Sequence, residues 1–223
     1  MGQHIHLNTS RMQCIGAYVA RAERPRGGLV VVQEIFGVNA HIRSVADRFA
    51  AEGYTAIAPA FFDHVESGVE LGYDADGMRR GRKLAGEIPF DLAIEDVASA
   101  AEAIASAGNI GCVGYCWGGT VAFLAATRLG MPAVSYYGAR NVQFLDETPR
   151  APVMFHFGSR DRSIPPEAVE RHRAAMPDAE VHTWPAGHAF NRDVDPDAYE
   201  GSSAQQALDL TLGFFARHLR STG

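Results

Sequence analysis

The sequence predicts an α/β protein with a mostly parallel central sheet and helices on both faces of that sheet. Short apolar runs of strand length alternate with longer amphipathic segments through most of the chain. This alternation is typical of parallel strands joined by helical crossovers. The chain has 223 residues, of which 47% are apolar and 21% charged, and no linker-like stretch divides it. These values favour one globular domain over residues 1–223.

The first half of the chain contains three expected strands and one clear helix. Met12 to Ala20 is expected to be an antiparallel strand at the edge of the sheet. Gly28 to Gln33 is a buried strand, and Asn39 to Gly53 is a helix that begins at a capping asparagine and ends at a glycine. Tyr54 to Pro59 is the next strand. Residues 60–85 are expected to form an irregular surface segment that leads into a short helix and forms part of a pocket wall or lid.

The second half continues the same alternation of strands and helices. The expected strands are Ile110–Tyr115, Val134–Tyr137, Val153–Phe157 and Glu180–Trp184, and the expected helices are Asp91–Ala107, Trp117–Leu129, Pro165–Met176 and Ser203–Arg220. Right-handed crossovers place the carboxyl ends of parallel strands at one edge of the sheet. We therefore expect the functional residues in the loops that follow these strands.

Charge and composition exclude several classes of protein. The net charge is −6, which argues against a nucleic-acid partner and means that a bound anion would need local cations. The three cysteines, Cys14, Cys112 and Cys116, form no CxxC pair, so neither a disulfide framework nor a metal site is expected. No cofactor is predicted. No signal peptide or apolar run of membrane-spanning length is visible, so we expect a cytoplasmic protein with no membrane partner.

One motif carries most of the chemistry. An expected strand runs directly into an expected helix through Gly114-Tyr115-Cys116-Trp117-Gly118-Gly119. This Gly-x-Cys-x-Gly pattern matches the nucleophile elbow, in which small neighbours allow a sharp turn between strand and helix. The N-terminus of such a helix stabilises a thiolate and an oxyanion. A structural cysteine beside a tight turn would give the same pattern, so the motif alone leaves both interpretations open.

Two later loops favour the catalytic interpretation of Cys116. Asp161 follows the expected strand Val153–Phe157, and His188 follows the expected strand Glu180–Trp184. The chain order of nucleophile, acid and histidine is that of α/β-hydrolase triads. Because each residue lies just after a strand, all three are expected at one edge of the sheet. The sequence therefore predicts an α/β-hydrolase fold with Cys116 as nucleophile.

The chain also resembles the dienelactone hydrolase family, the carboxymethylenebutenolidases. The resemblance extends from Val30 to the closing helix. It is carried by Gln33-Glu34-Ile35-Phe36-Gly37, the cysteine elbow, Tyr136-Tyr137-Gly138, the loop from Gly158 to Asp161, and Gly187-His188-Ala189-Phe190-Asn191-Arg192.

This resemblance implies roles for five further residues. Glu34 matches a buried acid that helps to deprotonate the catalytic thiol when substrate arrives. The backbone N–H groups of Ile35 and Trp117 match the two oxyanion donors. Arg192 matches a cation that binds a substrate carboxylate and can hold the acid, and Tyr137 is expected to contact the substrate.

The chain departs from the family pattern around the expected pocket. The second carboxylate-binding arginine of the family aligns with Met78, although a neighbouring arginine could replace it, the candidates being Arg79, Arg80 and Arg82. The same alignment places Arg82 and Ala85 where the family has aromatic residues, and Ala189 where it has a serine. We retain Arg82 as a substrate-binding candidate. The hydrolytic residues thus match the family better than the pocket does.

The sequence analysis predicts a cysteine hydrolase of a lactone or ester, acting on a small and possibly anionic molecule. A thioesterase would need the same residues, and a non-catalytic binder on the same scaffold is an alternative from another class. The oligomeric state is open, with a monomer favoured.

Overall fold

A computed structural model describes residues 2–219, which contain eight strands and six longer helices. The strands are β1 Gln3–Asn8, β2 Cys14–Ala20, β3 Gly28–Val32, β4 Thr55–Pro59, β5 Ile110–Tyr115, β6 Ala133–Tyr136, β7 Val153–Gly158 and β8 Glu180–Trp184. The helices are α1 Ala40–Ala51, α2 Ala75–Glu87, α3 Phe90–Ala103, α4 Trp117–Leu124, α5 Pro166–Ala175 and α6 Gly201–His218, with short helical turns at Phe61–His64 (η1), Ala105–Ala107, Ala125–Leu129 and Asn141–Gln143. Arg220, where the last helix was expected to end, lies outside the described residues.

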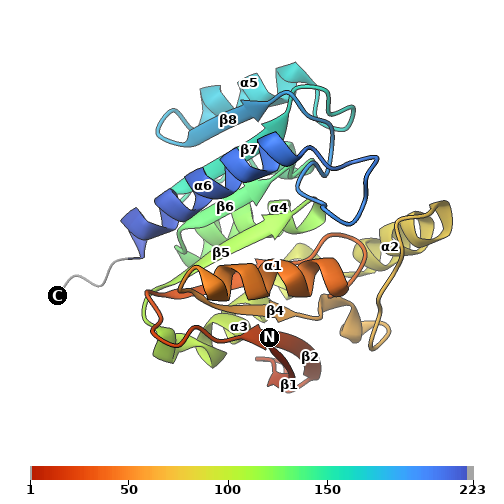
Figure 1. The fold of residues 1–223 in the computed structure, drawn as a ribbon, viewed down its shortest axis with the longest axis vertical. Helices are drawn as coiled ribbons and strands as arrows, with labels where there is room; N and C mark the ends of the chain where they lie inside the picture. The colour runs from red at the N-terminus through yellow and green to blue at the C-terminus, as the bar shows by residue number, and fades with distance from the viewer. Residues whose placement is uncertain (1, 220–223) are drawn as a thin grey trace.

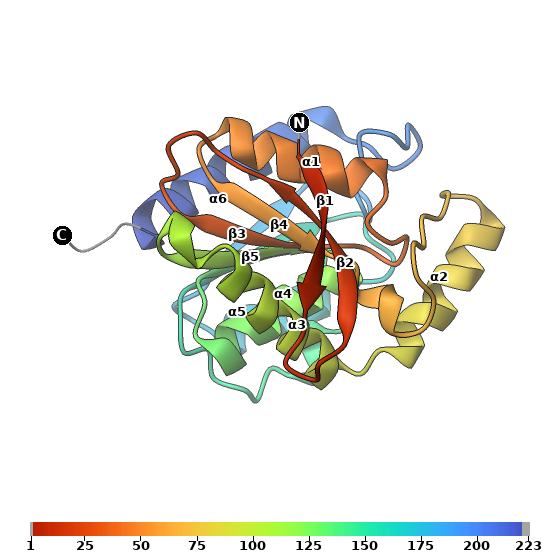
Figure 2. The same cartoon turned by 90° about the horizontal axis from the view of Figure 1, so that it is seen from below.

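All eight strands form one sheet in the order β1-β2-β4-β3-β5-β6-β7-β8. Strand β2 pairs antiparallel with both β1 and β4, and every other neighbouring pair is parallel. Helices α1 and α6 cover one face of the sheet, whereas α3, α4 and α5 cover the other (Figures 1 and 2). The predicted mostly parallel sheet with helices on both faces is confirmed.

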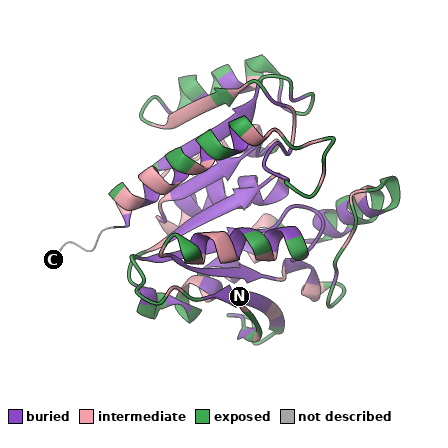
Figure 3. Cartoon of the chain, in the orientation of Figure 1, coloured by how far each residue is buried: buried purple, intermediate pink, exposed green. Residues whose placement is uncertain are grey.

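The central strands are buried because helices cover both of their faces. Every residue of β3, β4, β6 and β7 is buried, and the exposed residues gather on the outer sides of the helices (Figure 3). This explains why the sequence of these strands shows continuous apolar runs rather than alternation. Helix α1 begins as expected at Asn39, whose side chain accepts a hydrogen bond from the backbone N–H of Ile42.

The edge of the sheet differs from the prediction. The expected strand from Met12 begins at Cys14 and is antiparallel to β4, but it is not the edge strand. Strand β1 lies outside it and pairs with it along its whole length, from Gln3 to Asn8. Most of β1 is exposed, and Leu7 is its one buried residue. This weak apolar signal explains why the strand was missed.

The segment between β4 and α3 is more regular than predicted. It contains the turn η1 and then α2, a full helix of 13 residues. Glycines inside α2 weakened the helical prediction, because glycine is a poor helix former. Gly81 is needed for close packing, since a Cβ at this position would lie 2.0 Å from the backbone oxygen of Ile35. Helix α2 projects beyond the two helical layers (Figure 1).

The three cysteines are free thiols in different environments. Cys14 is exposed, Cys112 is buried in β5, and Cys116 is half-buried. Burial raises the pKa of the Cys112 thiol far above its ordinary value, which makes it a poor nucleophile.

No helix within residues 2–219 is both long and apolar enough to span a bilayer.

Candidate active site

Cys116 lies at a strained turn between β5 and α4. Its backbone has φ 56° and ψ −114°, a positive φ that side-chain-bearing residues rarely adopt. The turn brings α4 against the end of β3. A Cβ on Gly118 would lie 2.4 Å from the backbone oxygen of Gln33 and 2.5 Å from that of Val32. The predicted elbow geometry is therefore present, and glycine at position 118 makes it possible.

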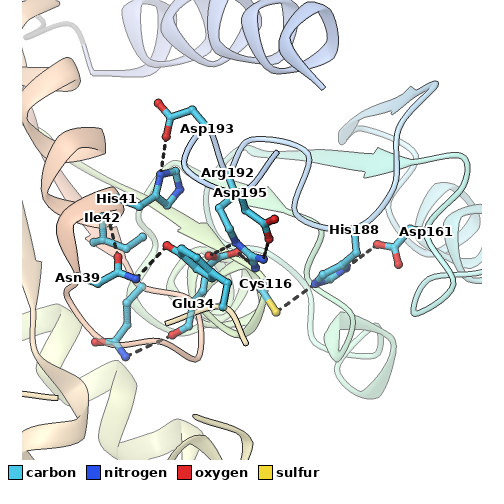
Figure 4. Close-up of polar contacts among 12 residues, drawn as sticks. Glu34, Asn39, His41, Ile42, Cys116, Asp161, His188, Arg192, Asp193 and Asp195 are labelled. Carbon is cyan, nitrogen blue, oxygen red and sulfur yellow. Dashed lines mark hydrogen bonds and ion pairs between the residues drawn. The ribbon is translucent and has the colours of Figure 1, made fainter. Parts of the chain in front are cut away.

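Cys116, His188 and Asp161 form a continuous hydrogen-bonded chain (Figure 4). The Sγ of Cys116 lies 3.2 Å from Nε2 of His188, and Nδ1 of His188 lies 2.7 Å from Oδ2 of Asp161. The Asp161 side chain is fully buried, whereas 27% of the His188 side chain is exposed. The three residues come from the loops after β5, β7 and β8, so the structure brings them together at the edge where the sequence placed them.

The surroundings of His188 favour its charged form. Burial by itself lowers the pKa of His188, but the hydrogen bonds to Asp161 and Cys116 and the charges of both partners raise it to about 10. Because Asp161 accepts at Nδ1, the proton on Nε2 faces the sulfur of Cys116. At neutral pH this arrangement suits a thiolate–imidazolium pair, in which the thiolate is the nucleophilic form.

Two backbone N–H groups near Cys116 are available to a ligand. Ile35 follows β3 and Trp117 is the first residue of α4, and both line the same cavity as Cys116. Neither N–H donates a hydrogen bond to another group within residues 2–219. Paired free N–H groups beside a nucleophile can hold the negative oxygen of a tetrahedral intermediate.

Glu34 is paired with Arg192 and not with Cys116. The Glu34 carboxylate accepts from Nε of Arg192 at 3.0 Å and from Nη2 at 2.9 Å (Figure 4). Both residues are almost completely buried. Although burial alone lowers the pKa of Arg192, the charge of Glu34 raises it above its ordinary value. In this arrangement the group that contacts the thiol is His188.

A cavity of about 200 Å³ opens at Cys116 and His188. The expectation that residues 60–85 form part of the pocket wall is confirmed, since Met78 and Arg82 line the cavity together with Ala85. Arg140, in the loop after β6, also lines it. Arg140 was not among the residues predicted from the sequence, although it lies three residues after Tyr137 at the expected functional edge of the sheet.

Tyr137 lies behind the site rather than in the cavity wall. It is completely buried, and its ring centroid is 5.1 Å from that of His188. Its hydroxyl has no hydrogen-bond partner among the described residues. The ring therefore supports the imidazole, and a direct contact with substrate would need a movement of the tyrosine.

The comparisons with known proteins agree with the fold. Residues 15–219 match the dienelactone hydrolase family. A Yersinia pestis protein named "Putative carboxymethylenebutenolidase" is 34% identical over 226 residues, covering 91% of this chain and 83% of that protein. The carboxymethylenebutenolidase of Pseudomonas putida is 31% identical over 207 residues, and the match covers 87% of this chain and 87% of that protein. A crystal structure named "Putative Dienelactone Hydrolase", from Klebsiella pneumoniae, has a TM-score of 0.85 and 30% identity, and the match covers 97% of this chain and 99% of that one.

The sheet order, the elbow and the loops at its carboxyl edge define an α/β-hydrolase. Within that class, the chain belongs to the dienelactone hydrolase family. It is a hydrolase that acts on ester or lactone bonds.

Proposed function

We propose that Cys116, His188 and Asp161 are the catalytic triad of this hydrolase. The observation that carries the proposal is the contact of 3.2 Å between Sγ of Cys116 and Nε2 of His188 at a strained elbow. Asp161 orients the imidazole through Nδ1 and stabilises its positive charge.

In the first half of the reaction, the Cys116 thiolate attacks the carbonyl carbon of the ester or lactone. The carbonyl oxygen becomes an oxyanion, which accepts hydrogen bonds from the N–H groups of Ile35 and Trp117. The intermediate then collapses, the carbon–oxygen bond to the leaving group breaks, and the alkoxide takes a proton from Nε2 of His188. The product of this half is an acyl thioester on Cys116 and a neutral imidazole.

In the second half, water releases the acyl group. Neutral His188 takes a proton from the water as the oxygen attacks the thioester carbonyl. The same two N–H groups hold the second oxyanion, which collapses with loss of the Cys116 thiolate. The carboxylic acid leaves, and the thiolate–imidazolium pair is restored.

The cavity supports a small substrate. Its volume of about 200 Å³ is below the usual range of drug-sized pockets, which begins at about 300 Å³. Arg82 at the cavity supports a substrate with negative charge. Catalysis by a thiolate and the free Cys14 thiol suit a reducing compartment, so we place the reaction in the cytoplasm.

The test is hydrolysis of ester, lactone and thioester panels by the wild-type protein and by Cys116→Ala. We expect the variant to lose nearly all activity, and Cys14→Ser, which changes an exposed thiol outside the site, to keep it. Equal rates for wild type and Cys116→Ala would refute the proposed nucleophile. No turnover of any panel by wild type would favour a non-catalytic binder, and turnover of thioesters alone would favour a thioesterase.

A further inference from the structure

Trp117, the first residue of α4, is held by three aromatic rings. The ring centroids of Phe61, Phe62 and Phe90 lie 5.4, 6.3 and 6.2 Å from that of the indole. Trp117 is only 4% exposed, and its indole N–H has no hydrogen-bond partner among residues 2–219. Packing against these rings therefore fixes the position of the indole.

The three rings belong to two elements outside the loops that carry the proposed triad. Phe61 and Phe62 lie in η1, the short turn after β4, and Phe90 is the first residue of α3. One side of the indole thus contacts η1, and another contacts the start of α3. The position of Trp117 therefore depends on how η1 and α3 are held relative to each other.

A buried histidine–carboxylate pair joins the same two elements. Nε2 of His64, the last residue of η1, lies 2.8 Å from Oδ2 of Asp96 in α3. The side chains of His64 and Asp96 are 4% and 0% exposed. A buried pair of this kind adds little net stability relative to apolar packing, but it fixes the distance and direction between the elements that it joins.

The other contacts around this pair are weaker links. Nδ1 of His64 lies 2.7 Å from Oε1 of Gln13, an exposed residue between β1 and β2, where water competes for the hydrogen bond. Oδ1 of Asp96 has no partner among the described residues. The charges that act on Asp96 from its surroundings, Glu95 and Arg11, pair with each other. The contact between Asp96 and His64 is therefore the main polar link between η1 and α3.

The position of Trp117 matters because the elbow beside it is strained. Cys116 has a positive φ, and such a conformation persists only where the surrounding structure holds it in place. The N–H of Trp117 is one of the two proposed oxyanion donors, and its effect depends on pointing to where the oxyanion forms. A small displacement of Trp117 would therefore lower the rate without removing any catalytic side chain.

We propose that Asp96 and His64 are positioning residues for Trp117. Their hydrogen bond holds η1 against α3, the rings of both elements hold the indole, and the Trp117 N–H is thereby directed at the oxyanion. Neither His64 nor Asp96 lines the cavity at Cys116. The inference rests on the proposed roles of Cys116 and Trp117 in the reaction.

The kinetic test compares Asp96→Ala with Asp96→Asn on 4-nitrophenyl acetate, a neutral activated ester. Asparagine keeps an acceptor for His64, whereas alanine removes it. We expect Asp96→Ala and His64→Ala each to lower kcat about tenfold per reactive Cys116 thiol, with little change in KM. This is part of the loss of about a hundredfold or more that follows removal of one oxyanion donor. Asp96→Asn should keep most of the wild-type kcat.

Two control variants separate positioning from a general loss of stability. Gln13→Ala removes the exposed partner of His64, and Val45→Ala truncates a buried side chain of α1, on the opposite face of the sheet (Figure 1). Both should keep the wild-type kcat per reactive thiol. In Asp96→Ala, the rate of Cys116 alkylation by iodoacetamide should change much less than kcat, because the triad keeps its contacts. An equal fall in both rates would place the damage at the triad and overturn the inference.

The fluorescence of Trp117 tests its positioning without any turnover. In a Trp184→Phe background, Trp117 is the only tryptophan of the chain. We expect acrylamide to quench its emission more strongly after Asp96→Ala or His64→Ala, but not after Asp96→Asn or after Val45→Ala, which controls for unfolded protein.

The outcomes distinguish this inference from the proposed reaction. Wild-type quenching in both alanine variants, or raised quenching with a wild-type kcat per reactive thiol, overturns the inference. Raised quenching in a protein that hydrolyses no ester would support the positioning of Trp117 by Asp96 and His64, and would count against the proposed reaction alone.

Discussion

At the scale of single residues, we expect the charge of His188 to control how Cys116 reacts. With a pKa raised to about 10 by its partners, the imidazole stays protonated through neutral pH and holds a positive charge beside the sulfur of Cys116. We expect Cys116 to be alkylated by iodoacetamide faster at pH 7 in the wild type than in His188→Gln, because the variant lacks the positive charge beside the sulfur.

The measurement is mass spectrometry in a Cys14→Ser background, because Cys14 is exposed and would also be alkylated. Equal alkylation rates at pH 7 in wild type and His188→Gln would contradict stabilisation of the thiolate by the imidazolium. Ester hydrolysis by His188→Gln should fall about a thousandfold or more, as for other triad histidines.

The ion pair between Glu34 and Arg192 gives a second prediction at the residue scale. Glu34→Gln leaves the Arg192 charge buried without its main partner, which should lower the free energy of unfolding by about 3 kcal/mol or more. Because Glu34 does not contact Cys116, the alkylation rate of the resting thiol should stay the same. Chemical denaturation and the alkylation assay measure the two effects separately, and slower alkylation in the variant would instead support a role in deprotonating the thiol.

At the scale of elements, we expect a change at Gly118, in the turn between β5 and α4, to affect both the stability of the fold and the rate of catalysis. The space beside Gly118 is filled by the backbone oxygens of Val32 and Gln33 at the end of β3, which cannot move aside as a flexible side chain could. We expect Gly118→Ala to cost about 3 kcal/mol of stability and to lower kcat in the folded fraction, because α4 and the Trp117 N–H must shift. Denaturation curves combined with titration of the active thiol would show this, and wild-type kcat per active thiol would contradict it.

A second element-scale prediction concerns the contact between η1 and α3. Asp96 of α3 is fully buried and hydrogen-bonded to His64 of η1 at 2.8 Å. Burial raises the pKa of Asp96 to about 6, above its ordinary value of about 4 in the unfolded chain. The folded state therefore holds this proton more tightly, and its contribution to stability is lost as the pH rises through about 6.

The control for this prediction is Asp96→Asn, which cannot ionise and still offers His64 an acceptor. The free energy of unfolding of wild type, relative to this variant, should fall between about pH 4 and about pH 6 and stay constant above that range. A difference that does not change over this range would show that Asp96 is ionised throughout.

The elements differ in how well their sequences predict them, and the reason is packing. Strands β5 and β8 have the predicted bounds because each is a clear run between turn residues. Helix α2 was underestimated because of its glycines, and one of them, Gly81, packs against the backbone of Ile35, a contact that only the folded structure reveals. The meeting of Cys116, Asp161 and His188 at one edge of the sheet could be predicted because local motifs mark the ends of their strands. The pairing of Glu34 with Arg192 joins residues 158 positions apart, and no local pattern reports such a contact.

At the scale of the whole molecule, the sheet order separates the site from the edge formed by β1 and β2. The candidate site is built on loops that follow β3, β5, β6, β7 and β8, whereas β1 and β2 lie beyond β4 on one side of the sheet. Among residues 2–219, strand β1 pairs only with β2. A change in β1 should therefore act on stability without acting on chemistry.

Leu7→Ala tests this separation. Leu7 is 4% exposed, so its truncation should leave a cavity and lower the free energy of unfolding by about 2–4 kcal/mol. The kcat per active thiol should remain that of the wild type, because no residue of the cavity belongs to β1 or β2. Denaturant unfolding gives the free energy of unfolding, and kinetics on the same preparation, divided by the concentration of active thiol, give kcat. A fall in kcat per active thiol in Leu7→Ala, comparable with that in Gly118→Ala, would mean that the edge strands and the site are mechanically coupled through the sheet.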